Sequence, residues 1–219
     1  MIFIWVFRLM LSLLSNQPLV TCLTETDFKH WFQYAATLMN LMTEDSLQSF
    51  ITNEIFDLAI QYADPKLIMS LFVKSKEDVQ QSVIEDILYH FAVTDEYDNF
   101  VNLVQTEIRK PKLFANGETL FTSLIKKKNL KYCWEIINCE PNKKCTALPN
   151  SRNETPLQIS IEMELFDLMT PLIFNCAESD IEVNWHAPLI PLLQKLSKSN
   201  NVFGDYFRTH LMIDLECCG

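Results

Sequence analysis

The chain has 219 residues, of which 48% are hydrophobic and 11% aromatic, so it can bury a core and is not a disordered tail. Its net charge of −10 opposes nucleic-acid binding, because phosphate backbones repel acidic chains. The chain has only 3 Gly and 9 Pro. This composition favours a helical fold over a β-sandwich or a Rossmann-type fold, whose turns usually need more glycine.

Residues 1–14 form a strongly apolar stretch that Arg8 interrupts, and no basic residue follows Met1 directly. A secretion signal normally has a basic start and an unbroken apolar run, so we predict a core helix here and a cytoplasmic protein. The stretch is too short to span a bilayer as a helix, so a membrane partner is not expected. The alternative is a signal peptide over residues 1–15, in which case the chain is secreted and the sequon at Asn153 becomes relevant.

Four aromatic residues follow at helical spacing: Phe28, Trp31, Phe32 and Tyr34. Such a stripe is expected to belong to the core. Exposure of Trp31 on a binding surface is the alternative.

The middle of the chain repeats itself. A first helix is predicted to begin at Glu54, Ile87, Thr119 and Thr155, with spacings of 33, 32 and 36 residues. A second helix presents apolar residues 13, 14, 17 and usually 18 positions later, which is the stripe of one helical face. The core position five residues after each start holds Ala59, Ala92, Leu124 and Ser160.

Local chemistry supports the last of these helix starts. The Thr155 hydroxyl can cap the unpaired N–H groups of a first turn, and Pro156 needs no N–H there. Ser160 is expected to face the next hairpin, with its hydroxyl bonded to the Pro156 carbonyl.

The segment Thr155-Pro156-Leu157-Gln158-Ile159-Ser160 resembles the T-P-L-H-x-A opening of the ankyrin repeat, whose period is about 33 residues. Residues 116–120 are similar to the G-x-T-x-L form of the same motif. The resemblance implies an all-α fold, an α-solenoid of stacked antiparallel helical hairpins, as one domain over residues 1–219. Another α-solenoid and a non-repeat helical bundle are the alternatives. The approximate repeats are 17–53, 54–86, 87–118, 119–154, 155–186 and 187–215.

The chain departs from the family between the two helices of each repeat, where glycine is usual. Here those positions hold Ala63, Glu96, Lys128 and Glu164, so we expect turns of a different construction and shortened or lost β-hairpins. The resemblance also gives His90 the structural role of the first-helix histidine.

No catalytic motif is present, and 3 Gly leave no phosphate-binding loop, so we predict neither enzymatic activity nor a cofactor nor a small-molecule substrate. None of the 7 Cys forms a C-x-x-C pair. The six-residue spacing of Cys133, Cys139 and Cys145 is a weak metal signal, and buried reduced thiols are the expected alternative.

The resemblance implies a protein–protein interaction scaffold or adaptor whose partner is another protein and which does not bind nucleic acid. In this family, loop tips and exposed first-helix side chains grip the partner. A non-catalytic repeat segment of a larger enzyme or channel is the alternative, suggested by the apolar start and by the abrupt end at Cys217-Cys218-Gly219. The candidate partner-binding residues are Gln61, Tyr62, Thr94, Asp95, Lys127, Lys128, Glu162 and Glu164.

Overall fold

The computed structural model describes residues 51–165, together with residues 30, 32–34, 37, 48, 167–169, 171, 172 and 175. These residues are mostly helical and include no strand, which confirms the prediction of an all-α chain over the described part. The apolar stretch 1–14 and the segments 17–29 and 176–219 lie outside the described residues. The chain divides into two compact units, Met1–Pro111 and Lys112–Gly219, and each is considered by itself.

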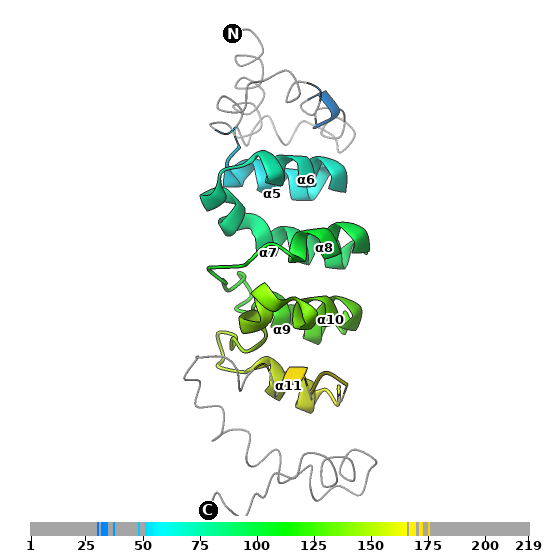
Figure 1. The fold of residues 1–219 in the computed structure, drawn as a ribbon, viewed down its shortest axis with the longest axis vertical. Coiled ribbons are helices and arrows are strands. Elements are labelled where there is room, and N and C mark those ends of the chain that lie inside the picture. The colour runs from blue at the N-terminus through cyan, green and yellow to red at the C-terminus, as the bar shows by residue number, and fades with distance from the viewer. Residues whose placement is uncertain are drawn as a thin grey trace, which may run out of the picture. The chain divides into compact units, whose positions relative to one another are not determined.

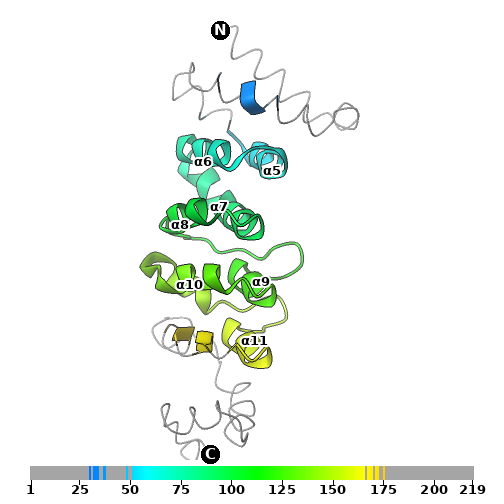
Figure 2. The ribbon, with the colours of Figure 1, turned by 90° about the vertical axis from the view of Figure 1, so that its right-hand side faces the viewer.

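The described part of the first unit includes a hairpin of two helices, α5 (Asn53–Tyr62) and α6 (Pro65–Lys74), which lie side by side (Figures 1 and 2). The carboxylate of Asp64 caps α6 by accepting a 2.9 Å hydrogen bond from the Leu67 amide, and Pro65 begins the helix. The predicted stripe of α6 is confirmed, because all four of its apolar positions are buried: Leu67, Ile68, Leu71 and Phe72.

The second hairpin joins α7 (Glu77–Val93) to α8 (Tyr97–Val104), and α7 packs against both helices of the first hairpin (Figure 1). The predicted start at Ile87 is wrong, because α7 begins ten residues earlier. No Gly or Pro interrupts residues 77–93, and Glu77 and Asp78 favour a helix start through the helix dipole. Apolar residues before the predicted start therefore extend the buried stripe, among them Val83 and Ile84.

A segment after α8 folds back along α7. The side-chain amide of Gln81 donates to the Glu107 carbonyl at 2.8 Å and accepts from the Arg109 amide at 2.9 Å. Arg109 also forms an ion pair with Glu77, and Ile108 is fully buried. These contacts hold the end of the first unit against its longest helix.

The second unit contains α9 (Leu120–Lys126), α10 (Leu130–Asn138), the 3-10 helix η1 (Glu140–Thr146) and α11 (Pro156–Glu162). Helix α9 packs against both α10 and α11, while η1 packs on α10 (Figures 1 and 2). The connection after α10 thus contains a helical turn, and the side chain of Cys145 within it is buried. The predicted apolar positions of the second helices are again buried: Tyr132, Cys133, Ile136, Ile137, Leu168, Met169 and Leu172.

Threonine caps begin both first helices of the second unit. Thr119 accepts a 3.1 Å hydrogen bond from the Thr122 amide, and the Thr122 hydroxyl accepts one from the Thr119 amide at 2.9 Å. Thr155 and Gln158 make the same reciprocal pair at 3.2 and 2.7 Å. The predicted cap at Thr155 is therefore confirmed, and it is a full capping box.

Candidate functional site

The eight candidate residues all lie where a first helix ends. Seven side chains are exposed, and that of Tyr62 is partly buried. Four belong to each unit, two at each turn. The turns are Gln61 and Tyr62 at the end of α5, Thr94 and Asp95 after α7, Lys127 and Lys128 after α9, and Glu162 and Glu164 at α11.

The expectation that these turns differ in construction from the glycine turns of the family is wrong at three of them. Asp95, Lys128 and Glu164 have φ values of 62°, 57° and 58°, in the region that glycine normally occupies. In the second hairpin the left-handed residue is thus Asp95, not Glu96. Ala63 has a φ of −87°, and only there among the four is the turn extended, with Asp64 capping the next helix.

One hydrogen-bond pattern closes the three left-handed turns. The amide that follows the left-handed residue bonds to a carbonyl five residues earlier: Glu96 to Phe91 at 2.8 Å, Asn129 to Leu124 at 3.0 Å, and Leu165 to Ser160 at 2.8 Å. This is the 6→1 bond of a Schellman motif. Phe91, not Ala92, is therefore the equivalent of Leu124 and Ser160.

The same register changes the interpretation of His90. Counting back from the turns, Tyr89 is the equivalent of Thr122 and Gln158, so the predicted alignment of His90 is wrong by one residue. Partial burial lowers the pKa of His90, although the charge of Glu96 acts in the opposite direction. The imidazole is consequently neutral near pH 7 and leaves the acidic charge of the adjoining turn intact.

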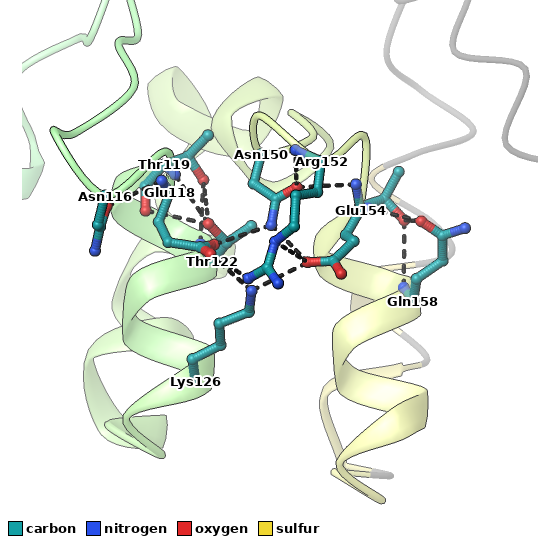
Figure 3. A network of polar contacts seen from close by, with 10 residues as sticks. Asn116, Glu118, Thr119, Thr122, Lys126, Asn150, Arg152, Glu154 and Gln158 are labelled. Atoms are coloured by element: carbon teal, nitrogen blue, oxygen red, sulfur yellow. Dashed lines mark hydrogen bonds and ion pairs between the residues drawn. The ribbon is translucent and has the colours of Figure 1, made fainter.

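A second group of polar residues lies around the N-terminal ends of α9 and α11 in the second unit (Figure 3). Two short turns, residues 114–118 and 150–154, have the same backbone bonds. The Phe114 amide bonds to the Glu118 carbonyl at 2.7 Å, and the Asn150 amide bonds to the Glu154 carbonyl at 3.0 Å. Each turn has a left-handed residue, Gly117 with φ of 80° and Asn153 with φ of 61°.

The two turns touch each other. The Ser151 amide donates to the Gly117 carbonyl at 2.8 Å. A Cβ at Gly117 would lie 2.1 Å from the Ser151 hydroxyl oxygen, so this contact requires glycine. The sequon residue Asn153 is exposed at the second turn, while the hydroxyl of its Thr155 is engaged in the helix cap.

Glu118 is the centre of the polar network in Figure 3, and its side chain is 8% exposed. One carboxylate oxygen lies 2.7 Å from Lys126 Nζ and 3.3 Å from Arg152 Nη2, and the other accepts from Asn150 Nδ2 at 3.1 Å. Glu154 shares these three partners, with Lys126 Nζ at 3.1 Å, Asn150 Nδ2 at 2.7 Å and Arg152 Nε at 3.6 Å. The network therefore ties the start of α11 to α9.

The network keeps its charges at neutral pH. Burial alone would raise the pKa of Glu118, but hydrogen bonds from Lys126, Asn150 and Thr122 outweigh it and lower the pKa to about 2. Burial likewise opposes the charge of Lys126, and the two carboxylates prevail and raise its pKa. Groups with such pKa values do not exchange protons near pH 7, so the arrangement serves to hold the turns together.

Sequence reasoning missed this network, although a signal for it was present. Gly117-Glu118-Thr119 and Asn153-Glu154-Thr155 share a pattern, a residue suited to left-handed backbone followed by Glu and Thr, 36 residues apart. The contact between the two turns, which gives the glutamates shared partners, is not encoded in either segment alone.

The remaining predicted features are dispersed. Cys133, Cys139 and Cys145 are buried free thiols, and burial raises the pKa of Cys133 to about 12. No group of three potential metal-binding side chains occurs within the part of the chain that the structure describes. Of the aromatic stripe, Phe32 is buried and Tyr34 is 69% exposed, while Phe28 and Trp31 lie outside the described residues.

No protein-family model, no curated protein and no solved structure matches the chain. Within the described residues, no helix has both the length and the apolar character needed to cross a membrane.

Proposed function

We propose that the chain is an ankyrin-like stack of helical hairpins that binds another protein through its hairpin turns and carries out no chemistry itself. We also propose that the protein binds no small-molecule substrate and that it is located in the cytoplasm. The buried thiols of Cys133, Cys139 and Cys145, which form no disulfide, suit a reducing compartment.

The observation that carries this proposal is the recurrence of one structural unit at a 36-residue interval. Gly117 and Asn153 are left-handed before the first helix, Thr119 and Thr155 cap it, and Lys128 and Glu164 are left-handed after it. A hairpin of this size cannot bury its apolar face alone, so repetition and stacking provide its core. A stacked array leaves a row of turns exposed, and such turns commonly contact partners.

The side chains at the turns add to the argument. An L-residue in the left-handed region costs about 1 kcal/mol relative to glycine. Asp95, Lys128 and Glu164 all have this unfavourable backbone conformation, and each has an exposed charged side chain. A stable turn alone would be better formed by glycine, so we infer that these charges act in binding.

Affinity purification with paired variants tests the proposal. The turn variant combines Asp95→Lys, Lys128→Glu and Glu164→Lys. The control variant combines Asp57→Lys, Lys66→Glu and Glu140→Lys, three exposed positions away from these turns with the same change in net charge. We expect the full-length control to retain the partners of the parent chain and the turn variant to lose them, with both melting as cooperatively as the parent. Retention of every partner by the turn variant contradicts the proposal.

A further inference from the structure

The turn between α7 and α8 exposes two large apolar side chains. Val93, the last residue of α7, is 50% exposed, and Tyr97, the first residue of α8, is 38% exposed. Within the described residues, few large apolar side chains are left this open, and the others are scattered: Tyr34, Val73 and Leu113. In that part of the chain, this is the one turn whose residues, 93–98, include two of them.

The same hairpin is rich in acidic residues. Residues 77–104, from the start of α7 to the end of α8, contain seven Asp and Glu residues and no Lys or Arg, in a chain of net charge −10. One of the seven, Glu77, is paired with Arg109. Asp95 and Asp98, on either side of Tyr97, are both exposed. The nearby His90 does not offset this charge, because partial burial lowers its pKa.

The turn is already ordered without a partner. Glu96 N–H bonds to the Phe91 carbonyl at 2.8 Å, and both the amide and the hydroxyl of Thr94 bond to the His90 carbonyl at 2.9 Å. A surface that is formed in advance loses little conformational entropy on binding. Tyr97 is flanked in the sequence by the exposed residues Asp95 and Asp98. An aromatic ring with carboxylates nearby in the chain suits a cation, which can gain both a cation–π contact and an ion pair.

We propose that the α7–α8 turn, residues 93–98, docks a protein segment in which an arginine or lysine adjoins an aliphatic or aromatic residue. The cationic group lies over the Tyr97 ring between Asp95 and Asp98, and the apolar residue covers Val93. This inference rests on the proposed function and specifies the chemistry of the partner at one of its turns.

Selection from a random twelve-residue peptide display library, with the full-length chain as bait, tests this docking surface. We expect enriched peptides to pair a basic residue with an apolar neighbour. In fluorescence anisotropy with synthetic copies, two double variants should each weaken binding at least tenfold: Val93→Ser with Tyr97→Ser, and Asp95→Asn with Asp98→Asn. Asparagine tolerates the left-handed backbone at residue 95, so the second pair removes charge with little effect on the turn.

Matched controls address loss of apolar area and loss of charge separately. Val73→Ser removes an apolar side chain that is 70% exposed, and Asp57→Asn with Asp78→Asn removes two exposed carboxylates from the same unit. Both controls should bind within twofold of the parent. Thermal melts of every variant identify any loss of fold, and the Asn variants remain informative if the Ser pair is unstable.

The result also separates this inference from the broader proposal. Enrichment of acidic or purely apolar peptides overturns the docking surface, as does unchanged binding of basic-apolar peptides to both turn variants. Some peptides could lose affinity for the Lys128→Glu variant but bind the α7–α8 variants normally. That result would support binding at the hairpin turns and would contradict a role for the α7–α8 turn. Peptides insensitive to every turn variant contradict both.

Discussion

The ammonium group of Lys126 lies 2.7 Å from a carboxylate oxygen of Glu118, within a single unit and eight residues apart in the chain. Because Glu118 is nearly buried, this pair is less screened than a surface ion pair. It joins a network that includes Glu154 from the following turn, so its strength determines how firmly the two turns are held.

Acid should destabilise the second unit through Glu118. Its folded pKa of about 2 lies below the ordinary carboxyl value of 4.5, so its contribution is fully present above pH 4.5 and is lost as the pH falls towards 2. The difference corresponds to about 3 kcal/mol at most. Urea unfolding between pH 7 and pH 2.5 should show a shallower loss for Glu118→Gln than for the parent. The exposed Glu140→Gln serves as the control, and an identical slope for all three proteins contradicts this role.

Gly117→Ala should destabilise the chain by about 1–3 kcal/mol, because alanine is strained at positive φ and its Cβ meets the Ser151 side chain. Combining it with Ser151→Gly removes the steric part and leaves the backbone part. Chemical denaturation of the two single variants and the double variant completes the thermodynamic cycle. Strict additivity would show that the two turns are not in contact.

Lys128→Gly should stabilise the chain by about 1 kcal/mol, because it relieves a lysine at φ of 57°. The neighbouring Lys127 has a φ of −86°, so Lys127→Gly offers a matched control that should destabilise it slightly. The two changes remove the same side chain and charge, one residue apart. Thermal melts that move in the same direction for both would contradict the left-handed turn.

These residues also show what the sequence could predict. Capping at Thr155 depends on neighbours within three residues, and the buried stripe of α6 depends on periodicity. Both features could therefore be predicted from the sequence. The early start of α7 was missed because the repeat was counted from Ile87, although residues 77–93 contain no Gly or Pro. The packing of α7 against α5 and α6 could not be read from the sequence. The role of Glu118 required knowing that turns 32 to 36 residues apart meet. Left-handed lysine and glutamate at 128 and 164 contradict the ordinary preference for glycine, which composition alone could not foresee.

Cys133 should resist alkylation in the native chain. Burial raises the pKa of its thiol to about 12, which leaves almost no thiolate at pH 8. Treatment with iodoacetamide at pH 8, followed by peptide mass analysis, should show Cys133 unmodified in the folded chain. The same thiol should be modified in urea without reductant. Modification at equal rates in both states would contradict its burial, and protection in urea would contradict a free thiol.

Ser160 provides the sharpest test of the register. Its side chain is fully buried in α11, and its hydroxyl donates to the Pro156 carbonyl at 2.8 Å, as the sequence predicted. Because the hydroxyl bonds only within its own helix, Ser160→Ala should be neutral or mildly stabilising. Ser160→Leu should overpack the site and cost about 1–3 kcal/mol.

The equivalent residue one hairpin earlier makes this cost specific to residue 160. Leu124 is also fully buried, and its carbonyl closes the same 6→1 turn bond, so the fold accommodates a leucine there. Leu124→Ser should therefore destabilise the chain through a cavity and an added polar group, while Ser160→Leu destabilises it through excess volume. Thermal melts of both variants decide the matter: if Ser160→Leu unfolds at the temperature of the parent, residue 160 has room to spare and the repeat register assigned to α11 is incorrect.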